Sequence, residues 1–200
     1  MAELEVEPVV LTGKHVRLEP MTEQHTPGLA EIGAGQSFWD FMLYGNINSA
    51  QDMRNWVLNI LSRAEKGTDL PFVAIHLASG RVAGATRYLN IVPKDRGLEV
   101  GGTWYGPEFQ RTAVNTECKY LLLRHAFESL GCIRVQLKTD TRNEKSQRAI
   151  ERLGAVKEGV LRNHLITPSG FYRSSVIYSI LDNEWLAIKT RLEKLLAGPG

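Results

Sequence analysis

The sequence predicts an α/β protein whose mixed sheet carries helices on both faces. Three observations predict it: candidate strands form hairpins early in the 200-residue chain, helices connect strands in its middle, and another hairpin follows late. Tight turns join antiparallel strands, whereas a helix between two strands allows a parallel crossover. No linker rich in Pro, Gly or Ser divides the chain, so we expect a single domain over residues 1–200.

The first half is predicted from alternation, helical spacing and turn residues. Alternating apolar and polar residues indicate half-buried strands, and apolar residues three or four apart indicate a helix packed on one side. The predicted elements are a strand at 15–20, a short helix capped by Thr22, a helix at 50–63 capped by Ser49 or Asp52, strands at 71–77 and 82–91 around a turn at 78–81, and a strand at 98–105.

The second half adds the crossover and the late hairpin. Glycine just after a helical pattern marks its end, and a cluster of turn residues joins two strands. The predicted elements are a helix over 118–130 ended by Gly131, a strand at 133–139, a helix at 143–153 ended by Gly154, strands at 156–161 and 171–181 around the turn 167–170, and an amphipathic helix at 184–196.

Composition narrows the classes of function. The formal net charge is +2 and the basic residues are interspersed with acidic ones, which argues against nucleic-acid binding. Cys118 and Cys132 form no metal-ligand pattern, so we expect no metal and free thiols in a reducing compartment. The chain shows no signal peptide and no window apolar enough to span a membrane. We therefore expect a cytoplasmic protein that binds neither membrane nor nucleic acid.

The first candidate site runs from the strand at 98–105 into the helix that follows. The first N–H groups of a helix lack internal partners and lie at the positive end of its dipole, so they can bind a pyrophosphate. Small residues at Thr112 and Ala113 would permit close approach, and the Arg111 guanidinium would add a fork for phosphate oxygens. The alternative is an ordinary capped helix with a surface arginine.

The second candidate site lies where the strand at 133–139 meets the next helix. Asn143 is a favourable N-cap and Ser146 follows at the third helical position. Asn143 either only caps its helix or also contacts a ligand bound at the first site, one strand away.

Together these motifs resemble the GNAT N-acetyltransferase superfamily, and the chain from about 11 to 185 resembles its RimJ/RimL-type members, which acetylate ribosomal-protein N-termini. The resemblance rests on Asn143 and Ser146, on AIERLGA at 149–155 and on EGVLR at 158–162. It implies a twisted, mostly antiparallel mixed sheet of about seven strands, acetyl-CoA as the acyl donor and an amine as the acceptor. The sequence leaves the oligomeric state open, a homodimer included.

The resemblance also implies the residues that bind CoA. They are Val100, Gly101, Gly102 and Thr103 along the pantetheine arm, Arg111, Thr112, Ala113, Val114, Asn115 and Thr116 around the pyrophosphate, and Asn143 and Ser146. Relatives usually place two small residues, mostly glycine, in the pyrophosphate loop, where this chain has Ala113 and Asn115. Alanine tolerates positive φ poorly, which predicts a loop built differently here.

Acyl transfer to an amine needs a base, a polarised carbonyl and a proton for the thiolate. The resemblance makes Glu99 the first candidate for the base and a contact of the acceptor, with Glu108 second; a solvated edge charge is the alternative for Glu99. Backbone N–H groups of residues 101–103 are candidates for polarising the carbonyl. Ser146 or Tyr178 is the candidate proton donor, unless Ser146 only bonds its own helix and Tyr178 belongs to the core.

The resemblance implies a primary amine as the acceptor, either a protein α-amine or a small molecule. Deprotonation at pH 7 costs an α-amine about 1 kcal/mol and a lysine about 4 to 5, which favours the α-amine. Trp39, Phe41 and Tyr44 lie where relatives place acceptor loops, and they either line that site or pack between helices. A non-catalytic acyl-CoA sensor and an enzyme that uses another donor, such as succinyl-CoA, are the alternatives.

Overall fold

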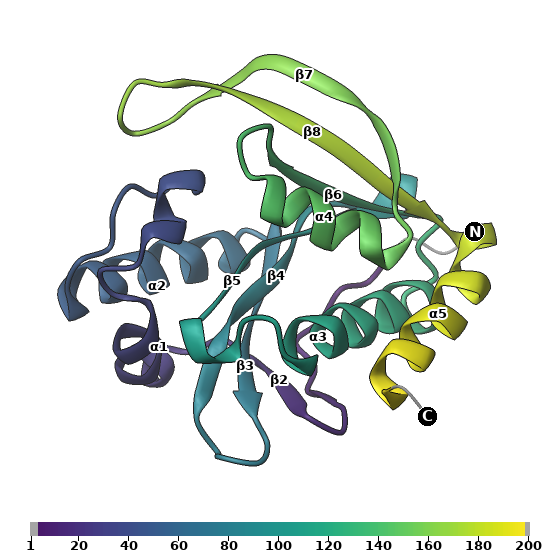
Figure 1. Ribbon diagram of the computed structural model, residues 1–200, viewed down its shortest axis with the longest axis horizontal. Helices are drawn as coiled ribbons and strands as arrows, with labels where there is room; N and C mark the ends of the chain where they lie inside the picture. The colour runs from purple at the N-terminus through teal and green to yellow at the C-terminus, as the bar shows by residue number, and fades with distance from the viewer. Residues whose placement is uncertain (1–3, 199–200) are drawn as a thin grey trace.

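The computed structural model describes residues 4–198, so both ends of the expected domain, 1–3 and 199–200, lie outside it. Within this range the chain forms an eight-stranded sheet in the order β1-β2-β3-β4-β5-β6-β8-β7 (Figure 1). The strands are β1 Leu11–Thr12, β2 Val16–Pro20, β3 Asp69–His76, β4 Val82–Val92, β5 Gly97–Tyr105, β6 Arg134–Asp140, β7 Val156–Ile166 and β8 Tyr172–Leu181. Neighbouring strands pair antiparallel except β5 and β6, which are parallel. The predicted mixed sheet is confirmed.

Five α-helices are described; two of them begin at their predicted caps, and one of these two also ends at its predicted glycine. They are α1 Thr26–Gly33, α2 Ala50–Glu65, α3 Ala113–Arg124, α4 Glu144–Leu153 and α5 Trp185–Ala197. Ser49 caps α2, because its hydroxyl accepts the Asp52 N–H at 3.1 Å. Asn143 caps α4 in the same way, and Gly154 ends that helix with a left-handed φ of 103°.

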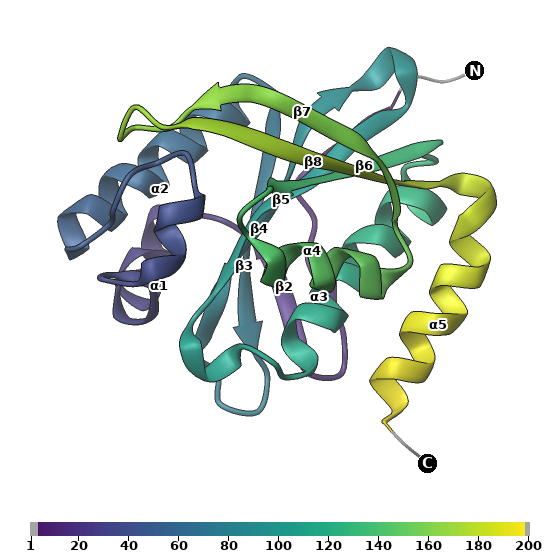
Figure 2. The same ribbon diagram turned by 45° about the horizontal axis from the view of Figure 1, so that its top comes forward.

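The helices cover both faces of the sheet, as the sequence predicts (Figure 2). On one face, Trp104 of β5 packs against Trp56 of α2, and α1 lies beside β4. On the other face, the Tyr88 hydroxyl of β4 donates to the Leu122 carbonyl of α3 at 2.6 Å. The two faces of the sheet therefore pack against two separate layers of helices.

The structure differs from the prediction in four places. β1 adds an eighth strand of two residues, too short for alternation to show. A short 3-10 helix, Ser37–Phe41, forms within the expected loop. The helix expected to reach 130 changes to a π-turn at His125–Ser129. β7 extends to Ile166 because a bulge between Leu161 and Leu165 interrupts its alternation without ending its pairing.

Two features of residues 4–198 bear on membranes and metals. None of the helices there is both long and apolar enough to cross a bilayer. Nor does that part of the chain bring three or more His, Cys, Asp or Glu side chains together as a metal site would require.

Candidate active site

The candidate site lies where β5 and β6 diverge. The two strands pair at only three positions, the last of them Glu99 with Gln136, and beyond that point they separate. β5 also carries a bulge. Arg87 and Ala85 of β4 are two residues apart, whereas their partners on β5, Gly101 and Trp104, are three residues apart. Gly102 takes up the extra residue with a left-handed φ of 58°, a conformation that glycine adopts without strain.

Glu99 lies at the fork and is only 3% exposed. Its Oε2 accepts three hydrogen bonds, from Asn90 Nδ2 at 2.9 Å, Gln136 Nε2 at 3.0 Å and Lys138 Nζ at 3.2 Å. The other oxygen, Oε1, lies 3.2 Å from the position that a Cβ of residue 101 would occupy. Three donors therefore fix the carboxylate, and the glycine at 101 keeps space beside its second oxygen. A solvated edge charge would be exposed, unlike this one.

The start of α3 lies at the open end of the fork. Thr112 caps the helix, and its Oγ1 accepts the Val114 N–H at 3.2 Å and donates to the Phe109 carbonyl at 2.7 Å. The left-handed residue of this loop is Arg111, with φ 60°, whereas Ala113 is already helical. The loop therefore avoids the strain that the sequence predicts at Ala113.

One predicted phosphate contact needs correction. A helix leaves its first four N–H groups without a helical partner, here those of residues 112–115, and the Val114 N–H donates to the Thr112 hydroxyl instead. Thr116 lies one residue beyond them, and its buried hydroxyl accepts a bond from Arg152 Nη2 at 2.7 Å. Thr116 therefore joins α3 to α4, and its backbone N–H is not one of those that the start of the helix leaves open.

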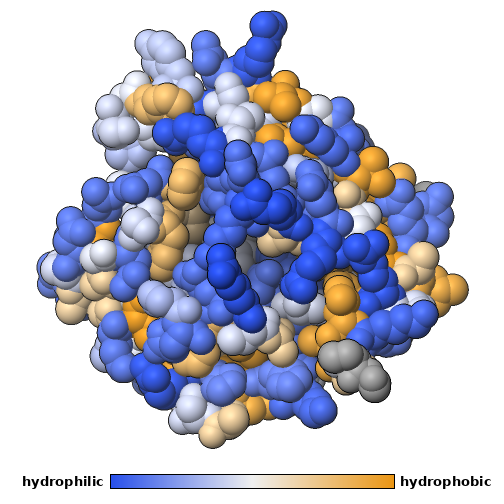
Figure 3. All heavy atoms as spheres, viewed as in Figure 1, coloured by the Kyte–Doolittle hydropathy of each residue, from blue (hydrophilic) through white to orange (hydrophobic). Residues whose placement is uncertain are grey.

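α4 begins beside the same loop. The Asn143 Oδ1 accepts the Ser146 N–H at 3.0 Å, so the capping role of Asn143 is confirmed. Lys145 Nζ donates to Gln110 Oε1 at 2.5 Å, which joins α4 to the residue before Arg111. The start of α4 therefore lies against the loop that leads into α3. Figure 3 shows hydrophilic side chains around a hollow near the middle of this side of the molecule.

Tyr178 and Glu108 do not take their predicted places. Tyr178 is fully buried, its hydroxyl donates to Glu151 Oε1 at 2.9 Å, and burial and then this contact raise its pKa to about 12. Alternation in β8 turns it into the core beneath α4, so it is not placed as a proton donor. Glu108 forms an exposed ion pair with Arg81 at 3.0 Å.

The prediction that Trp39 lines the acceptor site is also corrected, because Trp39 is 1% exposed and cannot contact an acceptor. Its Nε1 donates to the Gly33 carbonyl at 2.7 Å, and its ring packs against Trp56 and Trp104. Phe41 and Tyr44 are only half-buried. They lie beside two arginines: Arg173 donates to the Phe41 carbonyl at 3.1 Å, and Arg87 donates to the Tyr44 hydroxyl.

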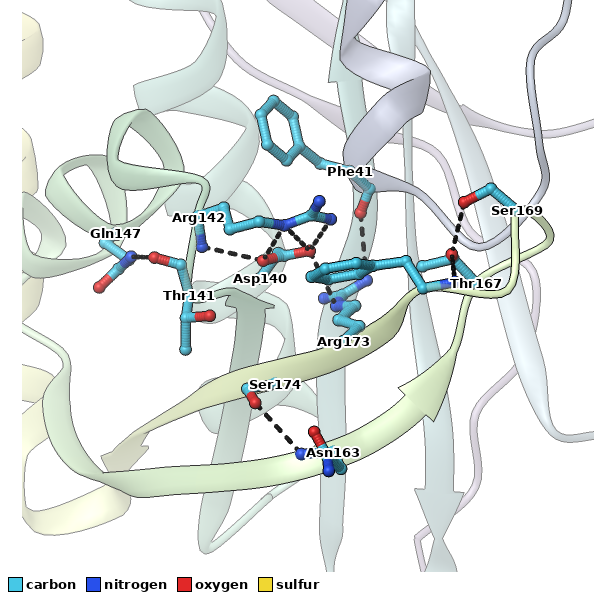
Figure 4. A network of polar contacts seen from close by, with 11 residues as sticks. Phe41, Asp140, Thr141, Arg142, Gln147, Asn163, Thr167, Ser169, Arg173 and Ser174 are labelled. Atoms are coloured by element: carbon cyan, nitrogen blue, oxygen red, sulfur yellow. Dashed lines mark hydrogen bonds and ion pairs between the residues drawn. The ribbon is translucent and has the colours of Figure 1, made fainter.

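A polar cluster that the sequence did not identify links these segments (Figure 4). Arg142 Nη2 lies 2.7 Å from Asp140 Oδ2, and its guanidinium lies 3.9 Å from the centre of the Phe171 ring. Arg173 approaches the same carboxylate at 3.8 Å. The cluster joins the end of β6, the tip of the β7–β8 hairpin and the loop before α2. Alternation along β6 could have predicted that Asp140 lies on the face opposite to Val135 and Leu137. Nothing in the sequence identifies Arg173 as its partner.

Cations also line the sheet near Glu99. Burial, followed by the charges of Lys138 and Arg173, lowers the pKa of His164 on β7, while Glu99 opposes the shift. Lys138, Arg173 and His164 therefore lie close enough to Glu99 for their charges to interact with it.

Comparison with known proteins identifies the family and the fold. The model of the acetyltransferase (GNAT) domain matches residues 15–156. The chain belongs to the GNAT acetyltransferase family. This GNAT chain is 28% identical to a GCN5-related N-acetyltransferase from Brucella melitensis, with a TM-score of 0.92 over 99% of this chain and 90% of that chain.

Two further relatives carry more specific names. The "Putative ribosomal N-acetyltransferase YdaF" of Bacillus subtilis (strain 168) is 33% identical over 109 residues, which span 54% of this GNAT chain and 58% of that relative. Mycobacterium smegmatis RimJ, solved in complex with CoA-disulfide, shares the fold at 18% identity and a TM-score of 0.80, over 94% of this chain and 95% of that one. The expected GNAT fold and the resemblance to RimJ/RimL-type proteins are both confirmed.

Proposed function

We propose that this protein transfers the acetyl group of acetyl-CoA to a primary amine, with Glu99 as the general base. The observation that carries the proposal is the fork itself: a buried, fixed carboxylate lies where β5 and β6 part, and a helix begins at the open end. Acetyl-CoA supplies an acyl thioester, and the family of the chain makes it the expected donor.

The residues around the fork fit a CoA-shaped ligand. The N–H groups of residues 112, 113 and 115, which have no helical partner, suit a diphosphate, and Arg111 and Lys145 add positive charge beside them. The pantetheine arm has an extended partner in residues 100–103, whose backbone lacks a neighbouring strand on the β6 side. N–H groups at the bulge of residues 101–103 are suited to polarise the thioester carbonyl.

Glu99 is suited to remove a proton from the attacking amine. The carboxylate is fixed through Oε2, which leaves Oε1 beside Gly101 for the amine or for a bridging water. Ser146, at the start of α4, would donate a hydrogen bond within the fork. Phe41 and Tyr44 remain candidates for the wall of the acceptor site.

The acceptor that we favour is the α-amine of a protein. An α-amine is the easier nucleophile near pH 7, and the name of one relative refers to ribosomal proteins. Such a substrate would place the protein in the cytoplasm.

The test is release of CoA thiol from acetyl-CoA with peptides that have a free N-terminus, N-terminally blocked lysine peptides and small amines. We expect turnover to be fastest with a free N-terminus. Glu99→Gln should lower kcat by about 100-fold or more, because the base is lost. Glu108→Gln is the matched control and should retain full activity, since that carboxylate is exposed and paired with Arg81.

Several results would contradict the proposal. Tight binding of acetyl-CoA without release on any amine would favour a sensor. Faster turnover with succinyl-CoA than with acetyl-CoA would show that acetyl-CoA is not the preferred donor. A wild-type pH–rate profile in Glu99→Gln would remove Glu99 as the base.

A further inference from the structure

Lys119 on α3 is a buried cation that neither the fold nor the proposed chemistry uses so far. The residue is 7% exposed, and its Nζ donates to Thr103 Oγ1 at 2.7 Å. Among residues 4–198, no carboxylate oxygen lies within 4.0 Å of this Nζ. Burial of an ammonium group without a close counter-ion is unfavourable by several kcal/mol. A functional role would explain why the chain keeps this buried ammonium group despite the unfavourable free energy of its burial.

The other buried charge of α3 has an evident structural role. Glu117 is 4% exposed and accepts the backbone N–H groups of Lys14, His15 and Val16 at 2.8, 2.6 and 2.7 Å. These bonds hold α3 on the turn between β1 and β2. Lys119 has three N–H groups for a single neutral hydroxyl, so packing alone does not explain why it is there.

The position of Lys119 relates it to the fork. Thr103 follows Gly102 in the bulge of β5, beyond the last residue of β5 that pairs with β6. Its hydroxyl also lies 2.8 Å from Thr86 Oγ1, so the group that holds Nζ is itself fixed. Nζ therefore lies against the stretch of β5 along which the proposed function places the thioester end of acetyl-CoA.

We infer that Lys119 is a catalytic residue, whose ammonium protonates the sulfur of CoA as the thioester breaks. The inference rests on the proposed acetyl transfer. The amine nitrogen bonds to the acetyl carbon, and Glu99 takes the proton that the nitrogen loses. The carbon–sulfur bond then breaks, its electron pair stays on sulfur, and a proton from Lys119 completes the thiol. Lys119 then takes up a proton from solvent, and Glu99 releases its proton to solvent.

The acidity of the group suits this step. Burial lowers the pKa of Lys119 to about 8, although the charges of Cys118 and Glu99 act in the opposite direction. A thiol has a pKa of about 8.5, so the two groups exchange a proton at little cost. An alcohol such as Ser146 is a far weaker acid, so it can donate a hydrogen bond to the sulfur but leaves it without a proton.

The first test compares the binding of CoA and of desulfo-CoA, which lacks the sulfur, by titration calorimetry. A charge-assisted hydrogen bond to sulfur predicts that the wild-type protein binds CoA about tenfold or more tightly than desulfo-CoA. In Lys119→Met the ratio should fall to about one, while the affinity for desulfo-CoA stays unchanged. The kcat for acetyl transfer should fall by about 100-fold.

The second measurement excludes a merely structural role. Removal of a buried, unpaired charge should leave the melting temperature of Lys119→Met unchanged or higher, whereas loss of a structural contact would lower it. Lys66→Met is the matched control, since Lys66 is exposed at the end of α2, and it should change neither the ratio nor kcat. Lys119→Gln serves for the same comparison if the methionine variant does not fold.

Two outcomes separate this inference from the proposed function. If wild-type protein binds CoA but Lys119→Met keeps the full preference over desulfo-CoA, the role of Lys119 is overturned and the proposed function stands. If the wild-type protein binds neither ligand, the proposed function fails, and the role of Lys119 fails with it.

Discussion

Asp140 shows how a buried charge can serve two segments at once. Its carboxylate accepts the Arg142 backbone N–H at 2.8 Å and lies 2.7 Å from Arg142 Nη2 and 3.8 Å from Arg173 Nε. Burial would raise the pKa of Asp140, but hydrogen bonds from Arg142 and the charge of Arg173 outweigh it and hold the pKa below its ordinary value. Arg173 in turn bonds the Phe41 carbonyl, so this carboxylate supports the loop on the acceptor side.

We expect Asp140→Asn to destabilise the protein by about 3 to 5 kcal/mol, since it leaves the buried Arg173 without its counter-ion. Urea denaturation measures the change. Because the pKa of Asp140 is lower in the folded state, its contribution is present above the pKa of the unfolded chain and is lost as the pH falls through the folded value. The variant should therefore lose less stability on acidification than the wild-type protein.

Asp95→Asn is the matched control, because Asp95 is exposed in the turn between β4 and β5, and its stability should be close to that of the wild-type protein. Equal stability of Asp140→Asn and wild-type protein at neutral pH would contradict the account of this cluster.

At the scale of elements, the sequence predicted the helices and turns whose ends carry capping or turn residues. The two ends of α4 follow from Asn143 and Gly154, and the hairpin turn at 78–81 follows from its turn residues. Partners far away in the chain decide the rest. Whether Trp39 is exposed depends on Trp56 and Trp104, and local alternation does not reveal which face Tyr178 takes.

The candidate site divides in the same way. Glu99 and the start of α3 could be predicted because each falls on a local pattern that resembles the family. Lys119, Lys138 and Arg173 could not, since their significance depends on the Thr103, Glu99 and Asp140 side chains that β-pairing and helix packing bring to them.

The two capped helices allow a test of whether Asn143 does more than cap. Ser49→Ala and Asn143→Ala each remove one acceptor from a helix start, so both should lower the free energy of unfolding by about 1 kcal/mol. If Asn143 also contacts CoA, only Asn143→Ala should weaken CoA binding, by calorimetry about tenfold. Unchanged affinity in Asn143→Ala would leave it a cap alone.

At the scale of the whole molecule, the sheet is two parts joined at one parallel contact. β1 to β5 form an antiparallel part, β6, β8 and β7 form another, and the three pairs between β5 and β6 hold the two together. α3 and α4 begin on either side of the gap, and the contacts of Lys145 with Gln110 and of Arg152 with Thr116 bridge them. The gap therefore follows from the short parallel pairing of β5 and β6, and the starts of α3 and α4 lie beside it.

The central claim is that this gap binds CoA through the start of α3. A crystal structure of the protein with CoA tests it most directly. We predict diphosphate oxygens within hydrogen-bond distance of the N–H groups of residues 112, 113 and 115, and the sulfur beside the bulge of β5 and within reach of Glu99. A diphosphate bound elsewhere on the molecule, or no bound CoA at saturating concentration, would contradict the account.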